Sequence, residues 1–64
     1  MKNTIKIERA KSNFTQEDLA KRLGVSRQTV NSIEKGRYVP STTLALKMSG
    51  VFGVSVNELF SLED

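Results

Sequence analysis

The sequence predicts an all-α fold in which five short helices enclose one small core. Three observations support this prediction: apolar residues recur at spacings of three and four, residues that start helices precede the apolar runs, and glycines follow them. The expected helices cover residues 4–12, 16–23, 27–33 and 42–52, and a fifth begins at residue 56. At 64 residues the chain has room for one domain, which we expect to span residues 1–64.

The first expected helix places Ile5 and Ala10 on its inner face and its lysines in solvent. Ile7 fits this apolar stripe poorly, so its burial stays open. Residues 12–13 break the helix, and Phe14 is expected to pack against the entry of the next one. Thr15, followed three residues later by Asp18, forms a capping pattern that starts the second helix.

Residues 16–34 are predicted to form a helix-turn-helix. Gly24 ends its first helix, because a residue without a Cβ can adopt the left-handed conformation found at helix ends. Ser26 begins its second helix, since the hydroxyl can accept a hydrogen bond from a backbone N–H one turn on. Ala20 lets the two helices approach closely. The inner side of the pair is expected to consist of Leu19, Ala20, Leu23, Val25, Val30 and Ile33.

Two further helices follow a loop at residues 34–41, where Gly36 is expected to cap the preceding helix. Gly50, inside the fourth helix, indicates a close contact with a neighbouring element. The packing side of this helix should comprise Leu44, Ala45, Met48, Val51 and Phe52.

The pattern from Ser55 to Glu58 is a capping box and predicts a short helix that carries Leu59 and Phe60. Neighbouring apolar residues on one helix cannot both face the same core. Either Phe60 or Leu62 is therefore a candidate for a contact between subunits. Alternatively, both cover the edge of a small core.

Several kinds of chemistry are excluded by composition. The chain contains no cysteine and no histidine, so disulfides, thiol or imidazole catalysis and common zinc sites are excluded. No pair of remaining polar residues is placed as a catalytic pair, and we expect neither an enzyme nor a metal or cofactor site. The first residues lack the apolar run of a signal peptide, and no segment approaches a membrane span, so a cytoplasmic location is expected.

Positive charge is concentrated in the half of the sequence that holds the helix pair. Residues 1–37 contain nine basic and four acidic residues, a net charge of +5, whereas residues 38–64 carry a net charge of −2. This distribution is expected if the first half faces a polyanion, although small domains also acquire lopsided charge by chance.

The residues expected on the outward face of the third helix suit the edges of DNA bases. An α-helix fits the major groove of B-DNA, and its first turn reaches base edges when it enters by its N-terminus. Arg27 can donate two hydrogen bonds to guanine, and Gln28 can donate to and accept from adenine. Asn31 and Ser32 extend this surface by about one turn. The alternative is a solvated polar face, which most helices have.

A second group of residues suits the DNA backbone. Gln16 begins a helix, where unpaired backbone N–H groups and the helix dipole favour an anion such as phosphate. Thr29 is expected either to contact a thymine methyl group or to help cap its helix. The other candidates for phosphate contacts are Asn13, Lys35, Arg37 and Tyr38.

The segment FTQEDLAKRLGVSRQTVNSIEKGRYVPS resembles the helix-turn-helix of the phage-repressor and Cro class, the XRE family. Residues 4–60 resemble its compact five-helix, lambda-repressor-like domain. The resemblance implies that Gln16 lies at a phosphate and that residues 35–38 lie beside the DNA backbone. It also implies a structural ion pair between Arg9 and Glu34. The residues that it implies in the major groove are Arg27, Gln28 and Asn31 or Ser32.

Together these features predict a sequence-specific regulator of transcription that binds double-stranded DNA. We expect a repressor that acts as a homodimer on a palindromic operator, because one small domain reads only a few base pairs. The alternative is an antitoxin or another protein-interaction module whose partner binds the fourth and fifth helices.

Overall fold

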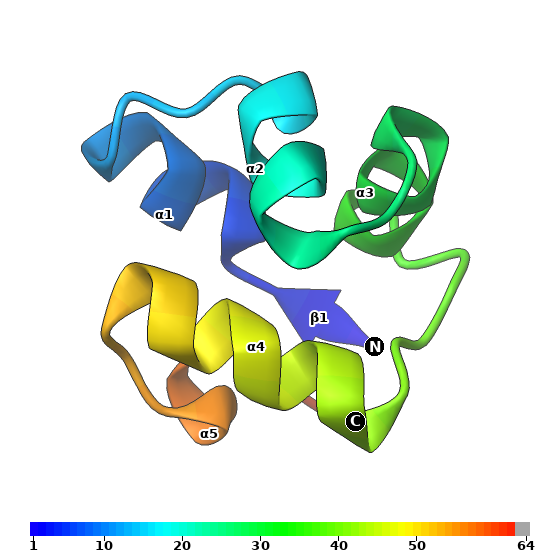
Figure 1. Ribbon diagram of the computed structural model, residues 1–64. Coiled ribbons are helices and arrows are strands. Elements are labelled where there is room, and N and C mark those ends of the chain that lie inside the picture. The colour runs from blue at the N-terminus through cyan, green and yellow to red at the C-terminus, as the bar shows by residue number, and fades with distance from the viewer. Residues whose placement is uncertain (63–64) are drawn as a thin grey trace.

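Five helices and two very short strands make up the chain in the computed structural model, which describes residues 1–62 (Figure 1). Glu63 and Asp64, which contribute to the negative charge counted above, lie outside the described residues. The helices are α1 (Ile5–Lys11), α2 (Gln16–Leu23), α3 (Arg27–Glu34), α4 (Thr42–Phe52) and α5 (Val56–Leu59). The strands are β1 (Lys2–Asn3) and β2 (Phe60–Ser61). The predicted all-α fold is confirmed.

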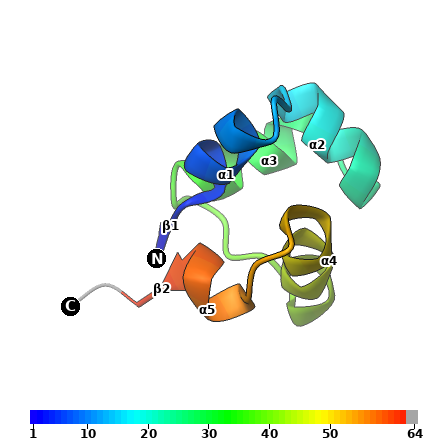
Figure 2. The same ribbon diagram turned by 90° about the vertical axis from the view of Figure 1, so that its left-hand side faces the viewer.

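The helices form two layers. In Figures 1 and 2, α1, α2 and α3 lie together on one side of the molecule, and α4 and α5 lie on the other. Each of the five helices has an apolar side that needs cover, and two facing layers bury these sides against one another. The core therefore lies between the layers.

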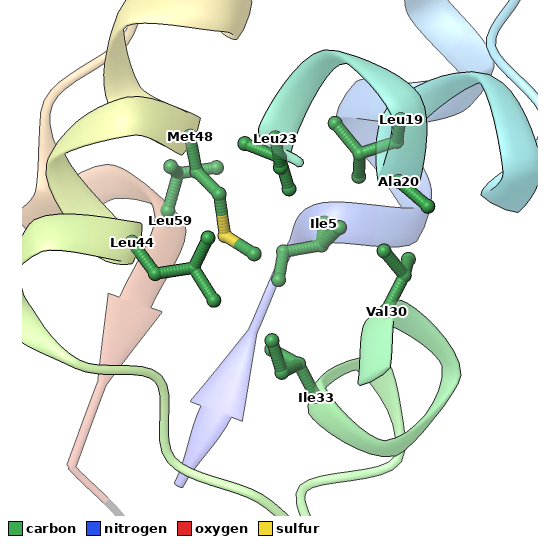
Figure 3. Close-up of a cluster of buried hydrophobic side chains, with 9 residues drawn as sticks. All are labelled: Ile5, Leu19, Ala20, Leu23, Val30, Ile33, Leu44, Met48 and Leu59. Carbon is green, nitrogen blue, oxygen red and sulfur yellow. The ribbon is translucent and has the colours of Figure 1, made fainter. Parts of the chain in front are cut away.

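The core draws on every helix (Figure 3). Fully burying one such aliphatic side chain stabilises the fold by roughly 1.5–3 kcal/mol, so this cluster is the main source of stability. Val25, Val51, Phe52 and Phe60 are partly buried against it. Its nine residues are Ile5, Leu19, Ala20, Leu23, Val30, Ile33, Leu44, Met48 and Leu59.

Local hydrogen bonds set the ends of the helix pair as the sequence predicts. Thr15 Oγ1 accepts from the backbone N–H of Asp18 at 3.0 Å, and the Asp18 carboxylate accepts from the N–H of Thr15 at 3.0 Å. Gly24 ends α2 with a φ of 75°, in the left-handed region. Ser26 Oγ accepts from the N–H of Thr29 at 3.1 Å and starts α3. The turn between α2 and α3 is thus specified within a few residues.

The strand pair was not predicted from the sequence. Lys2 pairs with Ser61 and Asn3 with Phe60, so the two ends of the described chain lie side by side. Asn3 also reaches α3, where its Nδ2 donates to the carbonyl of Ile33 at 2.9 Å. Strands of two residues show no alternation of apolar and polar positions, so no sequence pattern indicates them.

One prediction about α1 was wrong. Ala10 is exposed rather than buried, because it lies five residues from Ile5 and hence about 140° around the helix. Glu8 and Arg9, three and four residues from Ile5, are the half-buried ones instead. Ile7, left open above, is 56% exposed.

Three later predictions were also wrong. Gly50 is exposed, and a Cβ placed on it would meet no atom of a neighbouring element within 4 Å, so close packing does not explain this glycine. Phe60 does not belong to α5, since its extended backbone, with a φ of −128° and a ψ of 142°, ends the helix and enters β2. Glu34, placed above in the loop, is the last residue of α3.

Candidate nucleic-acid interface

The outward side of α3 presents two exposed polar side chains on its first turn. Arg27 and Gln28 follow the Ser26 cap directly, and within residues 1–62 neither side chain has a hydrogen-bond or ion-pair partner. They border a recess of about 150 Å³ together with Gln16 and Asn31. In Figure 1, α3 lies at one edge of the molecule. The donors of Arg27 and the amide of Gln28 are therefore available to a ligand that reaches the start of α3.

A hydrogen-bonded network links the start of α2 to the middle of α3. Gln16 Nε2 donates to Asn31 Oδ1 at 3.2 Å and to Glu34 Oε1 at 3.3 Å. The side chain of Gln16 is therefore held between the two helices rather than free in solvent. A phosphate at the start of α2 would be met by the first-turn backbone N–H groups other than that of Asp18, which donates to Thr15 Oγ1.

Arg9 holds the other side of this network. Its Nε lies 2.7 Å from Glu34 Oε2 and its Nη2 lies 3.2 Å from Oε1, while Nη1 donates to the carbonyl of Phe14 at 3.0 Å. The side chains of Arg9 and Glu34 are only 16% and 8% exposed. This two-bond geometry satisfies both carboxylate oxygens and fixes α1 against α3.

Thr29 and Ser32, two more of the predicted site residues, are half-buried. Thr29 Oγ1 lies 2.9 Å from Ser26 Oγ, so its hydroxyl takes part in the cap at the start of α3. The carbonyl of Ser32 accepts from the N–H of Arg37 at 2.9 Å, within the turn that ends the helix.

The predicted backbone-contact residues lie on two loops. Lys35, Arg37 and Tyr38 are exposed in the segment after α3, where Gly36 has a φ of 73°. Asn13 is exposed between α1 and α2, and its φ of 58° is positive, which asparagine tolerates better than most residues.

The comparisons with known proteins agree on the family of this chain. A helix-turn-helix family model matches residues 5–59, which include all five helices. The chain belongs to the XRE family of helix-turn-helix proteins. As a member of this family it is a DNA-binding regulator of transcription and not an enzyme.

Named relatives of this XRE protein come from archaea, bacteria and a phage. An uncharacterised HTH-type transcriptional regulator of Methanocaldococcus jannaschii is 58% identical over 64 residues, covering 100% of this chain and 97% of that one. An uncharacterised HTH-type regulator of Bacillus subtilis is 48% identical, with coverage of 100% and 97%. The ImmF control region 10 kDa protein of Bacillus phage phi105 is 36% identical over 55 residues, covering 86% of this chain and 61% of that one.

Arg22 of this XRE protein has a structural contact that sequence reasoning missed. Its guanidinium lies 4.3 Å from the centre of the Phe14 ring, and the Phe14 ring lies 6.3 Å from that of Phe52. A cation over an aromatic face is stabilising at the surface, and here it covers the junction of α2 with α4. The sequence does contain an indication of this contact: the aromatic Phe14 precedes α2, and the basic Arg22 follows it by about two helical turns.

The carboxylate of Asp18, which caps the start of α2, has a lowered pKa. Hydrogen bonds from the backbone and side chain of Thr15 lower the pKa of Asp18 from its ordinary value of 3.8, and the nearby charges of Lys21 and Arg22 act in the same direction. The ionised form is favoured because it is the form that accepts these bonds.

A groove on the opposite layer of the XRE protein is lined mainly by apolar side chains. It has a volume of about 460 Å³ and lies between α4, α5 and β2. Leu62 is 84% exposed and Leu46 is 60% exposed, whereas Phe60 is partly buried against the core. Phe60 and Leu62, the two predicted candidates for a subunit contact, therefore border the same groove.

Across residues 1–62 there is no cluster of three or more residues suited to hold a metal ion. None of the helices in this range has the length and apolar character needed to span a membrane.

Proposed function

We propose that the chain is a sequence-specific repressor that binds a palindromic operator as a homodimer and inserts α3 into the major groove. The observation that carries this proposal is the exposure of Arg27 and Gln28 side by side on the first turn of α3. Arginine matches the two acceptors of guanine, and glutamine matches the acceptor and donor of adenine. Both side chains are free to form these pairs.

Backbone contacts on either side of α3 would set the position of the helix. Exposed Lys35, Arg37 and Tyr38 follow α3. Gln16, at the N-terminus of α2, borders the same recess as Arg27 and Gln28 at the start of α3. Asn13 adds a polar side chain on the loop before α2, and Thr29 adds one within α3. Phosphate contacts of this kind fix register and orientation, while base contacts specify sequence.

Dimer formation is supported by the apolar groove of α4, α5 and β2. Leu46 and Leu62 expose large apolar surfaces at its rim, and a second copy of the chain would cover both. In a twofold dimer the same groove of both copies forms the interface. Two copies of α3 about 34 Å apart would then enter successive major grooves on one face of the duplex.

Repression requires less of the protein than activation does, because occupancy of a site is enough to block other proteins from it. The phage relative named as a control-region protein shares this domain. Both considerations support a repressor over an activator.

Selection from a random pool of double-stranded oligonucleotides tests the proposal. The expected result is an enriched sequence with two inverted half-sites whose centres are about one helical turn apart. Sedimentation of the complex should give two chains per duplex. Retention of DNA without enrichment of any sequence would contradict the proposal.

The second candidate function is that of an antitoxin or another protein-interaction module. The observation that favours it is the same groove, which offers an apolar surface for a different protein. Sedimentation of the purified chain without DNA separates the two candidates: a self-associated dimer supports the repressor, and a monomer at high concentration supports the interaction module.

A further inference from the structure

We infer that the side chain of Asn31 donates a hydrogen bond to the base that it contacts. We also infer that Glu34, acting through Gln16, determines that Asn31 presents its donor rather than its acceptor. The inference rests on the proposed insertion of α3 into the major groove. It adds that Asn31 recognises bases that present a hydrogen-bond acceptor. Glu34 and Gln16 are positioning residues here, and Asn31 is the residue that would touch the base.

The direction of each hydrogen bond follows from the charge at Glu34. The Glu34 carboxylate receives two bonds from the Arg9 guanidinium, with Nε at 2.7 Å and Nη2 at 3.2 Å, and a carboxylate so paired is ionised and only accepts. The Gln16 atom that lies 3.3 Å from Glu34 Oε1 must therefore be the amide nitrogen, because the amide oxygen would be repelled.

The same nitrogen fixes the orientation of Asn31. Gln16 Nε2 lies 3.2 Å from the Asn31 side chain, and since this nitrogen donates, the Asn31 atom that faces it must be the oxygen Oδ1. The amide nitrogen Nδ2 of Asn31 is left to face away from α2, and it has no hydrogen-bond partner among residues 1–62. This series of hydrogen bonds runs from Arg9 through Glu34 and Gln16 to Asn31. It turns the donor of Asn31 toward the recess that Arg27 and Gln28 border.

A donor at this position favours particular bases. A free asparagine pairs with adenine through both its oxygen and its nitrogen, but here the oxygen is turned toward Gln16. Guanine presents two acceptors in the major groove, and thymine and adenine present one each, whereas cytosine presents only a donor. Asn31 should therefore accept guanine, thymine or adenine and reject cytosine.

Asn31→Asp tests the polarity directly. One carboxylate oxygen can still accept from Gln16, while the other replaces the outward donor with an acceptor. In selection from a random pool, we expect the wild type to disfavour cytosine at one position by roughly five- to tenfold, and the variant to favour cytosine or adenine there. Asn31→Ala should lose preference at that position alone. A wild-type preference for cytosine there, or an unchanged profile in Asn31→Asp, would overturn the inference.

Two further variants test the positioning role. Gln16→Met removes the bridge without changing charge, and Glu34→Gln lets the amide of Gln16 turn either way. Both should reduce the discrimination against cytosine at the Asn31 position to less than about twofold and keep the preference set by Arg27. Loss of stability alone would weaken binding without altering the profile at one position. An unchanged profile in a folded Gln16→Met variant would exclude the positioning role.

A measurement without DNA separates this inference from the proposed function. In nuclear magnetic resonance spectra of the free protein, the side-chain amide protons of Gln16 should exchange with water at least about tenfold more slowly than those of Asn31, since both Gln16 protons are bonded. Equal exchange would overturn the inference whatever the DNA results. Slow exchange at Gln16 combined with no selected sequence would instead overturn the proposed function, and base reading by Asn31 with it.

Discussion

Arg9 and Glu34 join α1 to α3 through two parallel hydrogen bonds, at 2.7 Å from Nε to Oε2 and at 3.2 Å from Nη2 to Oε1. The Glu34 side chain is 8% exposed, so its charge depends on this partner for compensation. The pair therefore has two consequences: it holds the end of α3 in place, and it orients the polar groups beside it.

Arg9→Ala should lower the free energy of unfolding by about 3 kcal/mol, because it leaves a nearly buried carboxylate without its cation. Urea denaturation followed by circular dichroism measures the change. Lys11→Ala is the matched control, since Lys11 is 68% exposed and lies 3.5 Å from Glu8. The control should change the free energy by less than about 0.5 kcal/mol. Equal effects of the two variants would show that the Arg9 pair is not a structural contact.

Gln28→Ala should cost about 1–3 kcal/mol on the selected operator and relax the preference at one base position, because it removes a donor and an acceptor aimed at a base. Fluorescence anisotropy with the operator and with single-base variants gives both values. Random DNA serves as the internal control, where the affinity should barely change. An equal loss on random DNA would move Gln28 from base readout to backbone contact.

Arg37→Ala should weaken binding to all DNA similarly, because a phosphate contact carries no sequence information. The slope of log affinity against log salt concentration should fall in magnitude by about 0.9 per chain. Titrations at several salt concentrations measure the slope, with Lys11→Ala as a charge-matched control that keeps it. A slope equal to that of the wild type would remove Arg37 from the interface.

Leu62→Asp should raise the dimer dissociation constant at least about tenfold, because it places a charge in the apolar surface proposed to be covered by the second copy. Analytical ultracentrifugation measures this constant. Ile7→Asp is the matched control, since Ile7 is also exposed, at 56%, but lies on α1. Similar effects of the two substitutions, or no effect of either, would place the dimer contact elsewhere.

Asp18→Ala should be less stable than the wild type at neutral pH, and this difference should shrink in acid. The pKa of Asp18 is lowered in the folded state, so its stabilisation is fully present above the unfolded value of 3.8 and is lost as pH falls through the folded pKa. Urea denaturation at pH 7 and at about pH 3 compares the two proteins. Glu17→Ala, on the same exposed turn, should show a smaller dependence on pH. A difference at Asp18 that persists in acid would show that ionisation plays no part in the cap.

The features that were predicted correctly depend on contacts between residues close together in the sequence. The caps at Thr15, Ser26 and Ser55 and the left-handed stop at Gly24 each depend on contacts within a few residues. The features missed depend on distant partners or on rotation about a helix. Ala10 faces solvent because only one side of the seven-residue helix α1 meets the core.

The sequence by itself determined where α2, α3, α4 and α5 begin and that α3 opens with Arg27 and Gln28, since capping hydrogen bonds and helical spacing act locally. Only the tertiary structure decided which way the amide of Gln16 points. Its partners Asn31 and Glu34 lie 15 and 18 residues further along the chain, and packing of α1, α2 and α3 alone brings their oxygens to the same nitrogen.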